Sequence, residues 1–352
     1  MITILNKKNK ISNYIFKIFA TGVTVLFLIT FYSPNKATSQ NVSTKNQPEK
    51  ISFDSQVSRA NLKARYEAYL KNATSTIEKL SAQGKRSGKI KILVVPGHDN
   101  EYPGAIAGSK GATGGIIRET DLNLKIAGYL KSFLEQETAF EVYTTRDASF
   151  IKNNTENNQD KNGYTDYFQK YLDENIFTVL DYKDLYKKAT ENRSKSNSKK
   201  TSKVVEHVPA PGEMLYRLYA VNKFMEDNQI DIAIHIHLND YAGRNVTDGQ
   251  YKGFSIYVPD NSLRNGKQSQ ELAKYIAKAV DDKFKYSDNP IEKNKIILGN
   301  ELIANGSNNT TQAASVLIEY GYIYEKQFQD DEVLKSAAEQ TYLGIKNYFN
   351  KN

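Results

Sequence analysis

The sequence ILVVPGHDN at residues 92–100 begins with four apolar residues and then turns at a proline and a glycine to present His98. Such a run predicts a buried strand that ends in a tight turn. Similar runs follow along the chain and alternate with helical patterns. The predicted strands are 92–95, 142–144, 232–238, 254–258 and 316–318, and the predicted helices are 122–134, 215–225 and 272–284. This alternation predicts an α/β fold, a single domain with a largely parallel twisted sheet flanked by helices.

The composition is that of a folded protein with an unusual N-terminus. Of 352 residues, 39% are hydrophobic and 25% are charged, which is enough apolar sequence for a substantial core. The net charge is +8, but residues 1–50 hold seven lysines and one glutamate, which leaves +2 for the other 302 residues. A nearly neutral body argues against nucleic acid as a partner. The chain has no cysteine, so any metal must be bound by His, Asp or Glu.

The N-terminal segment has the features of an export signal. Four lysines precede an uncharged run at residues 18–32, and the small residues Ala37-Thr38-Ser39 follow it. We predict that residues 1–39 are a signal peptide or an N-terminal membrane anchor, and the run is compatible with both. In either case the lysines stay inside and the body is exported to the cell envelope or beyond, with membrane contact only through this segment.

The remaining chain divides by composition. We predict a linker and helical stalk at residues 40–88 and the main domain at 89–350, interrupted by an insertion at about 151–212. The first half of the insertion has aromatic residues at helical spacing, from Tyr164 to Tyr171. They could form a platform for sugar rings or pack the insertion onto the domain, and we favour packing. The second half is rich in lysine and serine.

Polar residues at the ends of predicted strands are the candidates for chemistry, because ligands bind at the carboxyl edge of open α/β sheets. His98 follows the first strand, His235 and His237 lie in the strand at 232–238, and Glu319 ends a late strand. Glu119 precedes the helix at 122–134, near the same edge. Two histidines and one carboxylate are a common catalytic zinc set. His235 and His237 point to one face, so either or both could bind the metal.

Six motifs, in order, resemble the zinc-dependent N-acetylmuramoyl-L-alanine amidases of the amidase type 3 family of cell-wall hydrolases. Together they span residues 90–325. The motifs are ILVVPGHDN at 92–100, RETDLNLKIAGYL at 118–130, VYTTRD at 142–147, RLYAVN at 217–222, IHIHLND at 234–240 and SVLIEYGYI at 315–323.

The resemblance implies specific roles. His98, Glu119 and His237 would bind one Zn²⁺ ion, and Glu319 would be the catalytic acid and base. The substrate would be the peptidoglycan amide between N-acetylmuramic acid and L-alanine, and an activator protein is a further expected partner. The alternatives are a catalytically weak or partner-gated peptidoglycan-binding protein on the same fold, and a zinc peptidase or deacetylase.

This chain also departs from the family pattern. Asp99-Asn100 stands where the family has glycines, His235 replaces a small polar residue, and Tyr324-Glu325 replaces a Ser-Asn pair. His235 would either orient a ligand or substrate or be a packed core histidine.

Five further polar residues are candidates for a functional or a structural role. Asp99 and Asn239 could add contacts to a ligand or substrate. For Arg146 and Arg217 we favour a structural role, tying loops to carboxylates. For His207, in the insertion, we favour a solvated position over a lid.

Overall fold

The computed structural model describes residues 58–100, 103–108, 115–151, 162–173, 212–241, 249–259, 261, 263, 265–298 and 313–350. The predicted signal or anchor at 1–39, the lysine-rich half of the insertion and His207 lie outside these residues. All the described residues belong to one compact unit, which the chain forms from Ile51 onward.

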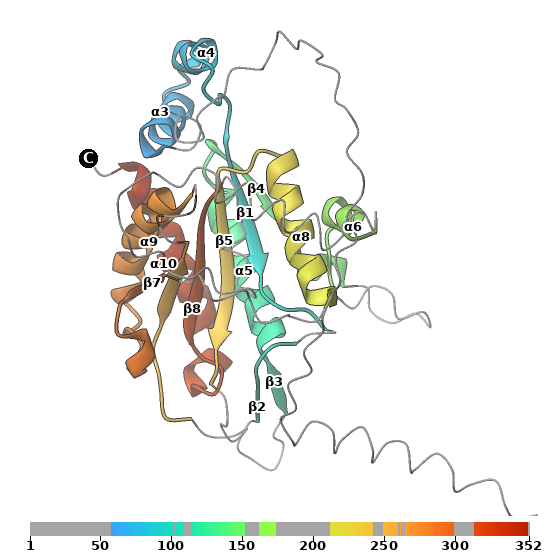
Figure 1. The fold of residues 1–352 in the computed structure, drawn as a ribbon. Helices are drawn as coiled ribbons and strands as arrows, with labels where there is room; N and C mark the ends of the chain where they lie inside the picture. Colours follow the sequence, from blue (N-terminus) through green and yellow to red (C-terminus); the bar gives the residue numbers. More distant parts are fainter. Residues whose placement is uncertain are drawn as a thin grey trace, which may run out of the picture. The chain divides into compact units, whose positions relative to one another are not determined.

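The unit is built around one six-stranded sheet in the order β4-β1-β5-β8-β6-β7 (Figure 1). Strands β4, β1, β5 and β8 are parallel to one another, whereas β6 is antiparallel to β8 and β7 is parallel to β6. A separate two-stranded antiparallel sheet pairs β2 with β3. The strands are β1 (Ile90–Pro96), β2 (Ile106–Gly108), β3 (Ile116–Arg118), β4 (Phe140–Thr144), β5 (Ile232–Asn239), β6 (Ser255–Val258), β7 (Ile296–Leu298) and β8 (Ala314–Tyr322).

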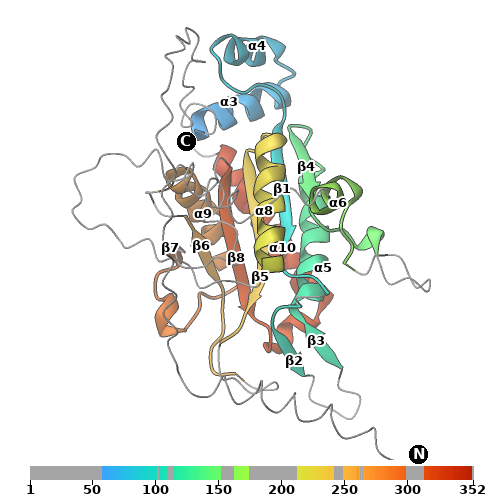
Figure 2. The ribbon, with the colours of Figure 1, turned by 45° about the vertical axis from the view of Figure 1, so that its right-hand side comes forward.

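Helices cover both faces of the sheet (Figures 1 and 2). α5, α9 and α10 pack with the apolar side chains of one face, and α8 packs with those of the other, next to α6. The helices are α3 (Arg59–Leu70), α4 (Thr74–Ala82), α5 (Glu119–Leu134), α6 (Asp166–Asp173), α8 (Gly212–Asp227), α9 (Gly266–Asp281) and α10 (Asp331–Asn350), with short 3₁₀ helices η1 (Ala148–Phe150), η2 (Pro290–Glu292) and η5 (Lys326–Gln329). The predicted fold class is confirmed.

The alternation of side chains along β5 decides which residues face α8. Ile232, Ile234 and Ile236 belong to the core on the α5 side, and Ala233 belongs to the core under α8. Successive side chains of a strand point to opposite faces, so His235 and His237 share the α8 face with Ala233.

The segment predicted as a stalk contributes to the main core. Leu62 and Tyr66 of α3 are buried in it, and the ring of Tyr66 stacks on Phe349 with centroids 4.8 Å apart. Arg65, also in α3, pairs with Asp231 at the start of β5. Helix α3 therefore packs on the domain that we predicted to begin at residue 89. The full set of domain boundaries stays a prediction.

The inserted aromatic residues form a helix that packs onto α8, as we favoured from the sequence. The rings of Tyr167, Phe168 and Tyr171 all contact Phe224 of α8, with centroids 5.3 to 6.1 Å apart. Phe168 is fully buried. These contacts account for the aromatic pattern without a sugar platform.

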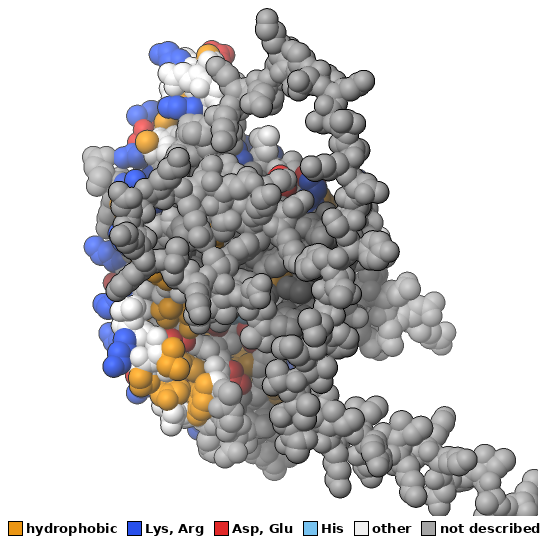
Figure 3. All heavy atoms as spheres, in the orientation of Figure 1, with side chains coloured by type: hydrophobic (Ala, Val, Ile, Leu, Met, Phe, Trp, Pro, Cys, Tyr) orange, Lys and Arg blue, Asp and Glu red, His pale blue; other side chains and the backbone are white. Residues whose placement is uncertain are grey.

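The surface of the described part is mixed in character. On the face drawn in Figure 3, lysine and arginine side chains lie along the left-hand edge, and a group of hydrophobic side chains lies beside the lower of them. Among the described residues Ile291 is the most exposed large hydrophobic side chain, at 89%. None of the helices in the described ranges is long and apolar enough to cross a membrane.

Candidate metal centre and active site

Three of the predicted site residues come together at the carboxyl edge of the sheet. His98 follows β1, Glu119 is the first residue of α5, and His237 lies near the end of β5. One nitrogen or oxygen atom from each lies within 4.8 Å of the others. Glu119 Oε1 is 3.3 Å from His98 Nε2 and 3.0 Å from His237 Nδ1. The two imidazole rings are nearly perpendicular, with centroids 5.0 Å apart.

Glu119 is fixed by backbone and side-chain donors. Its Oε2 accepts a hydrogen bond from the amide of Ala105 (2.8 Å), and its Oε1 accepts from Asn123 Nδ2 and from the amide of Leu238 (both 3.2 Å). Burial acts to raise the pKa of Glu119, but His98 and His237 outweigh it and hold that pKa well below its usual range. The carboxylate is therefore kept ionised, which is the form that binds a cation.

Two glycines allow the backbone to approach these ligands closely. A Cβ atom on Gly97 would collide with the ring of His237. Gly104 has a φ of +73°, and a Cβ there would collide with Glu119 and with the ring of His98. The space around the three side chains is therefore shaped by the absence of side chains at both positions.

Glu319 lies beside His237 on the neighbouring strand. The two residues are paired in the parallel ladder between β5 and β8, so their side chains leave the same face of the sheet. Within the described part of the chain, the Oε2 atom of Glu319 is buried and has no hydrogen-bond partner. Burial, together with the negative charges of Glu119 and Glu292, raises the pKa of Glu319 well above its usual range.

The structure places the other four candidates outside the cluster of His98, Glu119 and His237, and it joins two of them, Asp99 and Arg217. Asn239 donates to Glu292 (2.5 Å), and Asp99 is buried against Tyr164 and Arg217. Arg146 donates to the carbonyl of His98 (2.5 Å) instead of to a carboxylate, contrary to our expectation. Arg217 does bind a carboxylate, that of Asp99 (2.6 Å).

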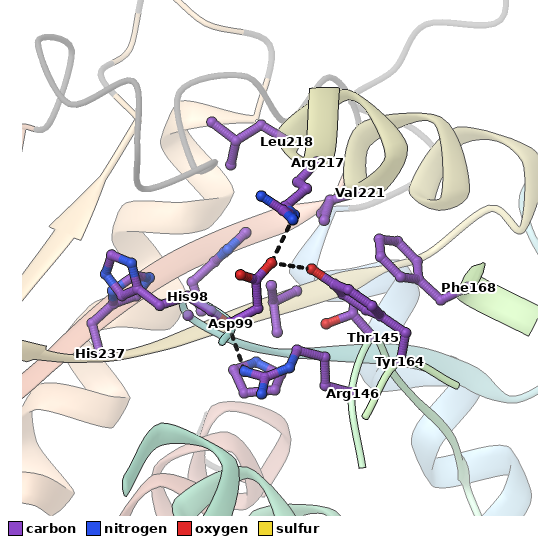
Figure 4. A pocket seen from close by; sticks show the side chains of 14 residues that line it. His98, Asp99, Thr145, Arg146, Tyr164, Phe168, Arg217, Leu218, Val221 and His237 are labelled. Atoms are coloured by element: carbon purple, nitrogen blue, oxygen red, sulfur yellow. Dashed lines mark hydrogen bonds and ion pairs between the residues drawn. The ribbon is translucent and has the colours of Figure 1, made fainter. Parts of the chain in front are cut away.

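His235 is buried two residues before His237. Burial, aided by the proximity of His237, lowers the pKa of His235 to about 3, so its ring is neutral. In the described part of the chain its Nε2 atom has no hydrogen-bond partner. The ring lines a cavity of about 80 Å³ that lies between the sheet and α8 and is also lined by His98 and Phe168 (Figure 4).

Comparison of the chain with known proteins identifies its family. The family model described as N-acetylmuramoyl-L-alanine amidase, amidase type 3, matches residues 92–347. The chain belongs to this family. Its activity is therefore that of a peptidoglycan amidase. No curated protein matches the chain.

Several solved amidase structures are similar to this amidase at low identity. An N-acetylmuramoyl-L-alanine amidase from Clostridium difficile 630 is 15% identical with a TM-score of 0.45, and the match covers 76% of this chain and 100% of that one. Ami1 from Mycobacterium smegmatis is 12% identical with a TM-score of 0.45, and the match covers 75% and 99%. The CwlD amidase from Clostridioides difficile, solved in complex with the GerS lipoprotein, is 19% identical with a TM-score of 0.44, and the match covers 75% and 100%.

One departure of this amidase from the family pattern has a clear structural role. The hydroxyl of Tyr324 donates to the carbonyl of Tyr251 (2.7 Å) and accepts from its amide (3.1 Å). Glu325 Oε1 accepts from the amide of Gly253 (3.0 Å). The pair therefore fastens the chain before β6 to the segment that follows β8, the strand that carries Glu319.

Sequence reasoning missed the group around Glu292 in η2. This carboxylate is 5% exposed and accepts hydrogen bonds from Asn239, from Tyr257 (2.7 Å) and from Tyr322 (3.1 Å). It also adds to the electrostatic field at Glu319. Glu292 stands in a turn outside every motif, so only the three-dimensional contacts could find it.

Proposed function

We propose that this amidase hydrolyses the amide bond between N-acetylmuramic acid and L-alanine in peptidoglycan, with one Zn²⁺ ion held by His98, Glu119 and His237. The cluster of one oxygen and two nitrogen donors in a member of this family is the observation that carries the proposal. Nitrogen and oxygen donors suit Zn²⁺, and a set of three leaves a fourth position open.

Two of the three separations between the donors suit a single bound ion such as Zn²⁺. Tetrahedral zinc binds such atoms at about 2.0–2.2 Å, which puts two donors of one ion roughly 3.3–3.5 Å apart. The distances from Glu119 Oε1 to His237 Nδ1 (3.0 Å) and to His98 Nε2 (3.3 Å) are close to this value. Asn123 and the amide of Ala105 would keep the carboxylate oriented, the part that outer partners play at metal sites.

Glu319 is the group that would move the proton. A bound zinc ion supplies a water of lowered pKa and polarises the substrate carbonyl. Glu319 Oε2 would accept the proton of the attacking water, and its raised pKa would let it keep that proton until the departing amine of alanine takes it. Glu292, held by three donors, would keep the proton affinity of Glu319 high.

The N-terminal segment and the partners complete the proposal. Residues 1–39 would export the amidase and either be cleaved or remain as an anchor, so the enzyme would act on the cell wall from outside the membrane. A requirement for an activator protein would keep the amidase inactive until it is needed, because an unregulated wall hydrolase endangers its own cell.

The test is digestion of purified peptidoglycan by the chain from residue 40 onward, with and without a chelator, followed by mass spectrometry of the products. Released peptides with a free N-terminal alanine, lost on chelation and restored by zinc, are the expected result. Release of acetate would indicate a deacetylase, and binding without release would indicate a binding protein. Either outcome contradicts the proposal.

Matched variants test the roles of the residues. Glu319→Gln should bind zinc normally but lose about 10²- to 10⁴-fold in kcat, because only the proton acceptor is removed. Glu339→Gln, on the exposed face of α10, should keep full activity. His98→Ala should lose zinc. Turnover by Glu319→Gln at the rate of Glu339→Gln would exclude the assigned role.

A further inference from the structure

The loop that carries His98 is held in an unusual conformation. His98 has a φ of +62°, in the left-handed region that is strained for residues other than glycine. The surrounding contacts must stabilise this conformation. Arg146 provides one of them, because its Nη1 atom donates both to the carbonyl of His98 (2.5 Å) and to Thr120 Oγ1 (3.0 Å). One guanidinium group thus joins the backbone of His98 to the residue after Glu119.

The next residue, Asp99, is the second anchor of this loop. Its side chain is 1% exposed, and its Oδ2 atom accepts from the hydroxyl of Tyr164 (2.5 Å) and lies 2.6 Å from Arg217 Nε (Figure 4). Tyr164 belongs to the insertion, and Arg217 belongs to α8. A buried carboxylate with charge-assisted bonds fixes its position strongly, since removing a donor leaves a desolvated charge poorly compensated.

The same stretch of the insertion makes two more contacts with the loop. The carbonyl of Asn162 accepts from Arg146 Nε (2.5 Å), and its Oδ1 atom accepts from the amide of Asn100 (3.0 Å). Residues 162–164 therefore reach the loop at Asp99, at Asn100 and through Arg146.

We propose that Asp99 is a positioning residue through which the insertion holds His98 in its metal-binding conformation, so that the hydroxyl of Tyr164 sets the zinc affinity of the site. This inference rests on the proposed zinc site. It gives the described part of the insertion a supporting role in metal binding. Deleting residues 151–212 would then weaken zinc binding, because Tyr164 and Asn162 would be lost.

The test compares two tyrosines of the same segment in the full-length protein. Tyr164→Phe removes the donor to Asp99, whereas Tyr171→Phe removes a hydroxyl that contacts Asn228 (3.3 Å). Zinc affinity is measured by competition with a chromophoric chelator. Tyr164→Phe should bind zinc about 10-fold more weakly, the loss typical of outer partners of metal ligands, and Tyr171→Phe should bind as the wild type does. Equal affinities in the two variants would overturn the inference.

A double-mutant cycle separates positioning from general loosening. Asp99→Ala should weaken zinc binding at least as much as Tyr164→Phe, and the double variant should bind no more weakly than Asp99→Ala alone, because the alanine has no acceptor for the Tyr164 hydroxyl. Fully additive losses would contradict a shared route through Asp99.

Hydrogen exchange in the zinc-free protein gives a readout independent of the metal. The amide of Asn100 should exchange about 10-fold faster in Tyr164→Phe than in Tyr171→Phe, because the loop that it belongs to loses its anchor. If the wild-type protein binds no zinc, the proposed function is wrong. The exchange rate of the Asn100 amide then tests the role of Asp99 alone, and equal rates in the two variants would contradict that role.

Discussion

Replacing Arg65 with alanine should destabilise the domain, although Arg65 lies in the segment that we predicted to be a stalk. Arg65 Nη1 and Nη2 donate to the two oxygens of Asp231 (2.9 and 2.8 Å), and Nε donates to the carbonyl of Gly88 (3.1 Å). Nη2 also donates to the carbonyl of Lys89. The side chains of Arg65 and Asp231 are 2% and 1% exposed, so the pair is shielded from water.

The expected loss of stability depends on the contacts that Asp231 keeps when Arg65 is removed. Breaking a buried ion pair by removing one partner costs about 3–5 kcal/mol, because a desolvated charge is left. Arg86 Nη1 still lies 3.1 Å from Asp231 Oδ1, and the amide of Lys91 still donates to Oδ2 (3.0 Å). We therefore expect a loss near the lower limit, about 3 kcal/mol, from a total stability of roughly 5–15 kcal/mol.

The assay is urea unfolding of the full-length protein, followed by circular dichroism. The control is Lys63→Ala, which removes another cation of the same helix. Lys63 Nζ lies 3.9 Å from Glu67 Oε1, and the side chain of Lys63 is 22% exposed. That variant should lose at most about 0.5 kcal/mol. If Arg65→Ala were no less stable than Lys63→Ala, α3 would be a detachable stalk and the reasoning would be refuted.

Two further predictions concern the metal site and pH. Gly97→Ala should weaken zinc binding at least about 10-fold, measured by chelator competition, because its Cβ would displace His237; Gly128→Ala, where the added Cβ meets nothing within 4 Å, should bind normally. The pH prediction concerns the zinc-free protein. Burial lowers the pKa of His235 to about 3 in the folded state. Below about pH 6.5, His235 is therefore protonated in the unfolded chain but stays neutral in the folded chain. The free energy of unfolding should then fall by up to about 1.4 kcal/mol per pH unit as the pH drops from 6 to 4, and His235→Gln should lose that part of the slope; identical slopes would show that His235 is not held neutral.

Much of the fold could be predicted because the strands of a buried sheet are short apolar runs. The run at 232–238 is almost the full extent of β5, and the period-two pattern of its isoleucines placed both histidines on one face. Helix α10 was missed because the middle of its buried face, from Ala337 to Gly344, consists of small and polar residues that give a weak hydrophobic signal. Gly344, for example, packs so closely on Ile276 of α9 that a Cβ would strike the backbone.

The sequence predicted only those site residues that lie at the edge where the predicted strands end. That logic found His98 and Glu319, but it could not choose between His235 and His237, which share a face; the structure brings only His237 to Glu119. The sequence also does not fix the register between neighbouring strands. Only the structure shows that His237 pairs with Glu319. Tyr164 could not be connected with Asp99 because 65 positions separate them along the chain.

The position of β5 between β1 and β8 has a consequence for when this hydrolase can become active. His98 and Glu119 enter the fold with the first third of the chain, but His237 arrives only when β5 inserts beside β1, about 140 residues later. Closing so long a loop is slow compared with forming local helices. A chain that emerges from its N-terminus onward therefore has two of the three proposed metal ligands and no complete site, and Glu319 comes last of all. Synthesis order itself delays the appearance of a competent enzyme until nearly all of the chain has been delivered.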